Sequence, residues 1–276
     1  MNEPILDNYK TYIVLHYLYT SIDAVCLHVG DISPLEYALL TEIAEMPQGF
    51  PVQDMKRSYA KAWGDIETTS ELLEEKELVE RRRLANDRRK FALHATLKGR
   101  NRINTIDESF AFSLVDSTTR ITEERFEQFA TQLHGLQEQD ASRVAAGIIP
   151  SQPLRLLYLV NQHMVQECAR VDLSVSQFVV LCVLMVFPQS LCEEVIENRL
   201  GVSAGSSITA SVLDGLESRH LIRLADVASI TTEGTERAAL ILDRLRVKML
   251  EAFESVGAQR RENMVAAVES CLYLFA

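Results

Sequence analysis

The chain has 276 residues, of which 47% are hydrophobic and 24% are charged. This length and composition exclude a disordered chain and allow two domains, each with its own buried core. Eleven glycines and seven prolines are few, which favours a mainly helical fold. The formal net charge of −11 argues against nucleic-acid binding unless positive charge is concentrated locally.

Cysteine usage and hydropathy point to the cytoplasm. The sequence shows no secretory signal before its cysteines, so we expect a reducing compartment and no disulfide framework. The most apolar run, residues 178–187, is ten residues long. A membrane span needs about 20 such residues, so we expect no membrane partner. The five cysteines are Cys26, Cys168, Cys182, Cys192 and Cys271.

The first half of the chain predicts helices at residues 8–29, 34–46, 52–63 and 65–77, from apolar residues spaced three and four apart. Ser33 is the expected cap of the second helix. Two extended segments then flank a charged turn at residues 84–89, and further helices follow at 96–115 and 122–136. Helices followed by a hairpin predict a winged helix-turn-helix, and the long flanking helices are typical of a dimerising version.

The chain repeats itself once. Residues 15–47 match residues 156–188 without a gap, at an offset of 141. Tyr17 matches Tyr158, and Pro47 matches Pro188. We therefore expect two tandem winged-helix domains, at residues 1–141 and 142–276.

The predicted hairpin is strongly basic. Between residues 81 and 102 there are nine basic residues and one acid, which gives a local net charge of +8. Arg88 and Arg89 at the tip could lie over a DNA backbone and place a guanidinium in the minor groove, with Asp87 orienting it. The alternative is a solvated hairpin that only aids solubility. The basic residues are Arg81, Arg82, Arg83, Arg88, Arg89, Lys90, Lys98, Arg100 and Arg102.

The run from Leu35 to Arg102 resembles the MarR family of bacterial transcriptional regulators. The family pattern is a leucine-rich recognition helix, a GLV-x-R strand, a wing with D-x-R and an LT-x-x-G entry to the next helix. Glu77 and Ala95 depart from it, where the family has glycine and leucine. The residues that match are Leu78, Val79, Arg81, Asp87, Arg89, Thr96 and Gly99. The resemblance implies a DNA-binding regulator whose effector is a small molecule or an oxidant.

The helix predicted at 65–77 is the expected recognition helix, but it carries six acids and only Lys76 as a base. Acids near phosphates are unfavourable, so only its first turns could approach DNA. Thr68, Thr69 and Ser70 in those turns could contact DNA, with Lys56 and Arg57 of the preceding helix. An ordinary exposed helix surface explains these five residues equally well. The full set of expected DNA contacts is Arg88, Arg89, Asp87, Lys90, Arg81, Arg82, Arg83, Thr68, Thr69, Ser70, Lys56 and Arg57.

The second copy has a shorter wing. Sixteen residues separate Val79 from Thr96, whereas eight separate Ile222 from Thr231. We therefore expect the second copy to be a pseudo-subunit that completes a dimer-like architecture. Its apolar helix at 178–187 should be buried on nearly all sides.

An effector site is expected from the family resemblance, and the first helix supplies its candidate residues. Tyr12, His16 and Tyr17 cluster there, with Cys26 further along. They could bind a phenolic ligand or respond to oxidation, or they could simply form core. The sequence has no phosphate-binding glycine loop, nucleophile elbow or paired-histidine metal motif, so we expect no enzyme, no cofactor and no metal.

The sequence thus predicts a cytoplasmic bacterial transcriptional regulator of MarR type, a single-chain pseudo-dimer that binds double-stranded promoter DNA through its first wing. A small-molecule effector and a homodimer of two chains fit the same interpretation. The alternative is a winged-helix protein-interaction module, acting as a co-regulator or antirepressor with little or no DNA binding.

Overall fold

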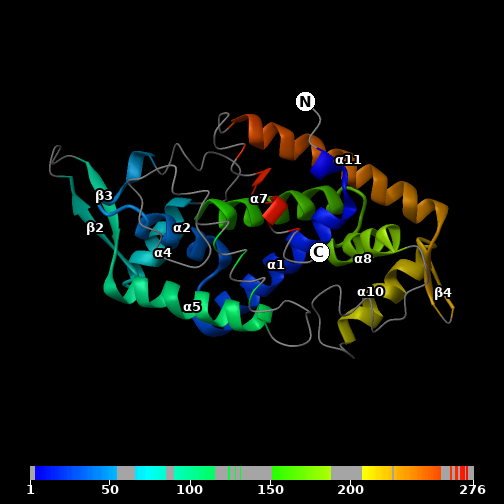
Figure 1. The fold of residues 1–276 in the computed structure, drawn as a ribbon, viewed down its shortest axis with the longest axis horizontal. Coiled ribbons are helices and arrows are strands. Elements are labelled where there is room, and N and C mark those ends of the chain that lie inside the picture. The colour runs from blue at the N-terminus through cyan, green and yellow to red at the C-terminus, as the bar shows by residue number, and fades with distance from the viewer. Residues whose placement is uncertain are drawn as a thin grey trace. The chain divides into compact units, whose positions relative to one another are not determined.

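The computed structural model describes residues 4–54, 66–84, 90–115, 151–187, 207–225 and 227–255, with residues 124, 128, 131, 262, 265–266, 268–270 and 272. Over these residues the protein is mainly helical with small antiparallel sheets, as the sequence predicts (Figure 1). The chain forms two compact units. The first unit is Ser21–Leu159, and the second combines Met1–Thr20 with Val160–Ala276.

The helices of the first unit follow the predicted order. Helix α1 (Tyr9–Val25), whose last residues belong to this unit, continues as a π-helical segment η2 (Cys26–Gly30). Asp31 then adopts a left-handed conformation, with φ of 51°, which ends the helix. Helices α2 (Pro34–Ala44), α4 (Ile66–Glu75) and α5 (Leu97–Val115) complete the described helical part. The predictions at 8–29, 34–46, 65–77 and 96–115 are therefore confirmed, except that the first helix ends in a π-turn.

A three-stranded antiparallel sheet lies at one end of the first unit. The predicted hairpin is confirmed as strands β2 (Val79–Arg83) and β3 (Phe91–Ala95), paired from Val79 opposite Ala95 to Arg83 opposite Phe91 (Figure 1). A further strand, β1 (Phe50–Pro51), pairs with the other edge of β3 and was not predicted. Leu93 and Ala92 are fully buried, so the sheet packs onto the core where β3 passes through its centre.

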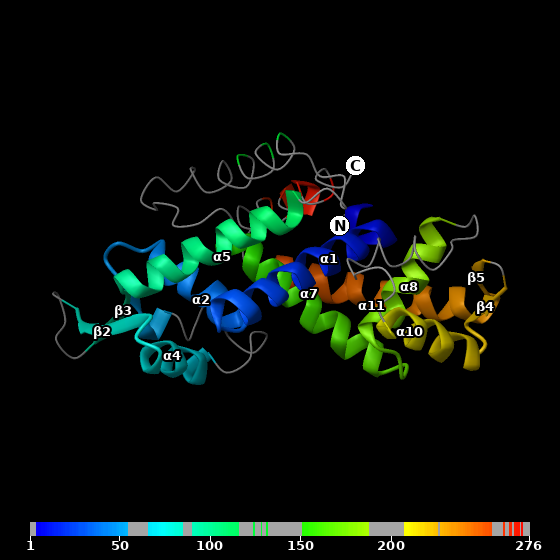
Figure 2. The same cartoon turned by 90° about the horizontal axis from the view of Figure 1, so that it is seen from below.

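The second unit repeats this order with shorter strands. It contains the last part of α7 (Ser151–Ala169), then α8 (Val175–Val186) and α10 (Ser207–Ser218). A two-stranded sheet of β4 (Ile222–Leu224) and β5 (Ala228–Ile230) leads to the long helix α11 (Thr232–Ser255) (Figure 2). Every residue of α8 from Phe178 to Leu184 is buried, which confirms that this apolar helix is enclosed.

The two repeats build the same helix starts. Ser33 accepts a hydrogen bond from the Glu36 amide, and the Glu36 carboxylate accepts one from the Ser33 amide. Ser174 and Gln177 form the same reciprocal pair at the start of α8. These capping boxes satisfy amides that the first helical turn leaves open. The predicted cap at Ser33 is therefore confirmed.

The two repeats also build the same junction between hairpin and long helix. Thr96 donates to the carbonyl oxygens of Glu77 and Leu78, at 2.8 and 3.1 Å. Thr231 donates in the same way to His220 and Leu221, at 2.8 and 3.0 Å. Glu77 and His220 both have a left-handed backbone, with φ of 59° and 60°. This conformation favours glycine, yet both repeats have another residue at this position.

The leading helices of the two repeats are exchanged between the units. The second unit takes residues 1–20, which include most of α1, and the first unit takes the start of α7 as far as residue 159. In the first unit, the amide and hydroxyl of Ser151 donate to the Glu45 carboxylate, at 2.8 and 2.5 Å. Arg155 pairs with the buried Glu42 at 3.3 Å. Each unit therefore depends on residues from both repeats.

Two predicted helices, at 52–63 and 122–136, lie largely outside the described residues, although residues 52–54, 124, 128 and 131 are helical. The α1–η2 segment, Tyr9–Gly30, is the one described helix that is long and apolar enough to cross a membrane, because its most apolar stretch of 18 residues has a mean hydropathy of 1.3. Within its most apolar window, 56% is buried inside the protein. A core helix of a soluble protein meets the same criteria, so this is weak evidence for a membrane span.

Candidate nucleic-acid interface

The β2–β3 hairpin presents three arginines to solvent. Arg81, Arg82 and Arg83 are all exposed on β2, and strand alternation puts Arg81 and Arg83 on the same face of the sheet. The Arg83 guanidinium lies over the Phe91 ring, 5.9 Å from its centroid, and so is held by a cation–π contact. This strand can therefore offer guanidinium groups to an anion from both faces.

Two of these arginines already bind carboxylates. Arg81 holds the Glu74 carboxylate with two hydrogen bonds, Nε to Oε1 at 3.2 Å and Nη2 to Oε2 at 2.6 Å. Arg82 pairs with Glu80 on its own strand. The local charge of +8 counted in the sequence is therefore partly neutralised by neighbouring acids outside that count.

The cations at the base of the hairpin have structural partners. Lys98 pairs with Glu77 at 3.0 Å. Arg100 donates to the Ala44 carbonyl oxygen at 3.3 Å, and Arg102 donates to the Gly30 carbonyl oxygen. These side chains join α5 to its neighbours.

The outer part of the hairpin is described only up to its last paired residues. The Leu84 amide donates to the Lys90 carbonyl oxygen at 3.0 Å, and the Lys90 side chain is exposed. Asp87, Arg88 and Arg89, which the sequence places at the tip, lie outside the described residues. Lys56 and Arg57 of the predicted preceding helix lie outside them as well.

The three hydroxyl residues of α4 that were expected to contact DNA differ in their exposure to solvent. Thr68 is exposed, but Thr69 and Ser70 are buried, with 7% and 2% of their surface accessible. The Ser70 hydroxyl donates to the Glu67 carbonyl oxygen at 2.8 Å. The expected contacts from Thr69 and Ser70 are therefore not available in this conformation. The physical reason is helical periodicity, since both share the face of α4 that carries the buried Ile66 and Leu73.

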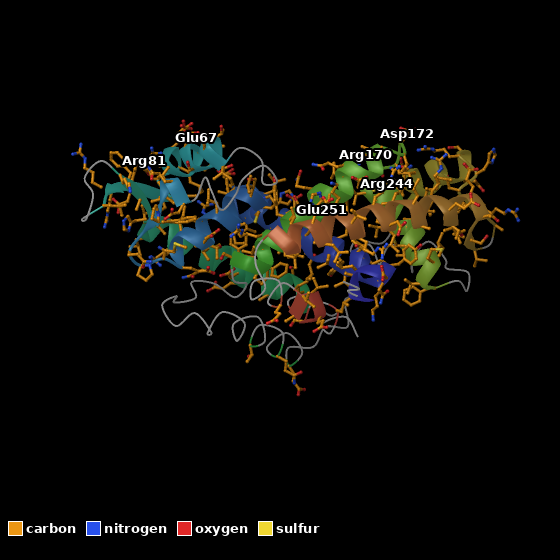
Figure 3. All side chains as sticks on the ribbon, turned by 90° about the horizontal axis from the view of Figure 1, so that it is seen from above. Glu67, Arg81, Arg170, Asp172, Arg244 and Glu251 are labelled. Carbon is orange, nitrogen blue, oxygen red and sulfur yellow. The ribbon has the colours of Figure 1, made fainter. Side chains whose placement is uncertain are left out.

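An acidic stripe runs along the solvent side of α4. Glu67, Glu71 and Glu75 are spaced four residues apart and are all exposed. Glu67 projects from the outer side of the helix (Figure 3). Carboxylates in this position repel phosphate, so α4 cannot follow a DNA backbone closely along its whole length.

The second hairpin offers far less positive charge. Strands β4 and β5 have three residues each, and Arg223 is the exposed arginine on β4. Ile222 and Ala228 are buried beside it. These two side chains pack the hairpin into the second unit.

The residues expected to form an effector site are all buried. Tyr12 donates to the Leu6 carbonyl oxygen at 3.2 Å and meets the Phe178 ring edge-on, with 6.4 Å between centroids. Burial lowers the pKa of His16 to about 4. Tyr17 is 8% accessible. These three residues belong to the second unit and contribute to its core.

Cys26, the fourth expected effector residue, belongs to the first unit and is fully buried. Burial raises the pKa of its thiol, and the nearby Asp23, Asp107 and Glu36 raise it further. The reactive thiolate form of Cys26 is therefore disfavoured in this conformation.

An open hollow beside α5 was not anticipated from the sequence. It has a volume of about 540 Å³ and is bordered by η2 and the first turns of α5. Leu97 is 76% accessible there and Val29 is 41% accessible, so its rim is partly apolar. The lining residues are Val29, Leu97, Lys98, Asn101, Arg102 and Thr105.

Within the described ranges, no group of three or more His, Cys, Asp or Glu side chains is placed to hold a metal ion. No protein-family model matches the chain, and comparison with curated proteins gives no significant match.

Proposed function

We propose that the protein is a DNA-binding transcriptional regulator in which one chain carries two tandem winged helix-turn-helix domains. The order of α2, α4, β2, β3 and α5 supports this assignment, because helices followed by a hairpin and a long helix are the elements of a dimerising winged helix. The same order recurs as α8, α10, β4, β5 and α11, with the same capping boxes.

The observation that carries the proposal is the cationic hairpin of the first unit within a protein of net charge −11. Arg83 and Lys90 are exposed on its described part, and the sequence adds Arg88 and Arg89 between them. The acidic stripe of α4 works against close contact between that helix and phosphates. The hairpin therefore makes the main contacts, and α4 contributes at most its first turn, where Thr68 is exposed.

The second unit takes the place that a second subunit has in a dimeric regulator. Because its short hairpin bears little charge, one chain offers one strong DNA contact. Tight binding then requires an asymmetric site or two chains on a palindrome whose half-sites lie about one helical turn apart. A small-molecule effector would act by changing the relative placement of the two winged units.

Selection of bound sequences from a random pool of duplex DNA tests this proposal. We expect the wild type to enrich a defined sequence, and the double variant Arg88→Ala/Arg89→Ala to enrich none while keeping its thermal melt. Arg223→Ala, in the second hairpin, is the matched control and should enrich the wild-type sequence. A pool that stays random with the wild type would argue against DNA recognition.

A second function, a protein-interaction module, is favoured by one observation, the exposed stripe of Glu67, Glu71 and Glu75 on α4. A helix with this face suits a basic protein surface better than DNA. This function predicts no duplex binding even at low salt, and loss of a protein partner when the three glutamates are changed to glutamine. Duplex binding that falls steeply with salt would reject it in favour of the regulator.

A further inference from the structure

We propose that Glu74 occupies the phosphate site at Arg81, so that DNA must displace this carboxylate before Arg81 can bind its backbone. This inference rests on the proposed DNA-binding function and identifies a residue that weakens binding from within. Glu74 lies in the last turn of α4, and Arg81 lies on β2. The contact therefore links the expected recognition helix to the hairpin that carries the positive charge.

The geometry is that of an anion site already filled. Two nitrogens of Arg81 meet two oxygens of Glu74, at 3.2 and 2.6 Å, in the forked arrangement that arginine also uses for phosphate. The pair is open to solvent, with 37% of the Arg81 side chain and 28% of the Glu74 side chain accessible. An incoming phosphate can therefore reach the guanidinium and compete for it.

The second repeat shows what the fold itself requires at this position. Glu217 corresponds to Glu74, and its carboxylate accepts a hydrogen bond from the Leu224 amide at 2.9 Å. Leu224 corresponds to Arg81, because it follows Arg81 at the same offset of 143 residues at which Glu217 follows Glu74. A glutamate at this position can thus accept a hydrogen bond from the backbone of the next strand, with no arginine present. The arginine in the first repeat is an addition that the shared fold does not need.

Displacing Glu74 exchanges one anion for another at Arg81. Such an exchange contributes little net affinity, and the released carboxylate then stands near the phosphate and repels it. The wild type should therefore bind any duplex more weakly than its basic hairpin alone suggests. DNA that cannot place a phosphate at Arg81 leaves the Glu74–Arg81 pair intact.

The test compares Glu74→Gln with Glu71→Gln, an equal change of charge at an exposed site one turn earlier on α4. Affinity for a labelled duplex is measured by fluorescence anisotropy over a series of salt concentrations. Glu74→Gln should tighten binding roughly three- to tenfold at low salt. It should also make the slope of log affinity against log salt more negative by about 0.9, the value for one net phosphate contact, because in the wild type the released Glu74 carboxylate offsets the charge that Arg81 brings to the phosphate. Glu71→Gln should give a smaller gain at an unchanged slope.

A double variant separates release of Arg81 from a general charge effect. Adding Glu74→Gln to Arg81→Gln should give no more than the Glu71→Gln gain, because no guanidinium remains to be released. Equal effects of Glu74→Gln and Glu71→Gln, or a full gain in the Arg81→Gln background, would overturn the role of Glu74 while leaving DNA binding intact. Absence of duplex binding by wild type and Glu74→Gln alike at the lowest salt would instead reject DNA binding itself, and the inference with it.

Discussion

His16 makes the stability of the second unit depend on pH. Its burial lowers the pKa to about 4, from an ordinary value of 6.5, and its Nδ1 has no hydrogen-bond partner among the described residues. Between these two values the unfolded chain binds a proton on His16 and the folded chain does not. The stabilising contribution is therefore complete above pH 6.5 and is lost as the pH falls toward 4.

The second repeat supplies a natural replacement, since Leu157 stands at the position of His16. Between pH 7 and 4.5, the wild type should lose about 2–3 kcal/mol more unfolding free energy than His16→Leu. Urea denaturation at the two pH values measures this difference. The same pH dependence in both proteins would show that His16 is accessible to protons in the folded state.

The sequence predicts the local role of a single residue better than it predicts which distant residues surround it. Ser33 is recognisable as a cap because its signal is local. The buried hydrogen bond from the Tyr37 hydroxyl to Asp107 joins residues 70 positions apart, so no local sequence pattern predicts it. Thr69 and Ser70 were expected to contact DNA because they lie in the first turns of the acidic helix, yet the spacing of Ile66 and Leu73 already puts them on the buried face.

The long helix packs closely against the backbone that enters the hairpin in both repeats. A Cβ added at Gly99 would lie 2.1 Å from the Leu78 carbonyl oxygen, and one at Gly234 would lie 2.1 Å from the Leu221 carbonyl oxygen. Either glycine changed to alanine should force α5 or α11 away from its strand and cost about 1–3 kcal/mol. At Gly215, the added Cβ would meet only the end of the Gln177 side chain, at 2.9 Å.

Thermal or urea unfolding of the three alanine variants checks this expectation. Gly215→Ala should cost less, because the added Cβ meets the end of a side chain rather than a backbone carbonyl, and alanine favours a helix. Stability of Gly99→Ala and Gly234→Ala equal to that of Gly215→Ala would contradict the close packing at the two junctions.

Elements with a periodic signal were predictable, and those made by pairing were not. The helices at 8–29, 34–46, 65–77 and 96–115 follow from apolar spacing. Strand β1 has only two residues and is defined by its pairing with β3, and no periodic signal predicts the π-helical conformation of η2. At the candidate site, the charge of the hairpin could be counted in advance. The ion pair between Arg81 and Glu74 depends on how α4 packs beside β2, and a count of charges in the sequence cannot predict this packing.

At the scale of the whole molecule, the exchange of leading helices makes the repeats interdependent. Cutting the chain between residues 141 and 142 removes Ser151 and Arg155 from the carboxylates of Glu45 and Glu42, which are buried in the first unit. Leaving one member of a buried ion pair without its partner costs about 3–5 kcal/mol. The first fragment alone should therefore not fold cooperatively.

Co-expression of the two fragments is the matched experiment. We expect fragments 1–141 and 142–276 to be poorly folded alone by circular dichroism, and to co-purify as a folded complex when produced together. A cooperative thermal transition for fragment 1–141 alone would contradict the exchange.

In the proposed function the first hairpin binds duplex DNA through its arginines. This claim is tested by the salt dependence of duplex affinity for the wild type and for Arg88→Ala/Arg89→Ala. The wild type should show a steep log–log slope, and the variant a slope shallower by about 0.9 to 1.8, the values for one and two lost phosphate contacts. Equal slopes, or no wild-type binding at low salt, would contradict the claim.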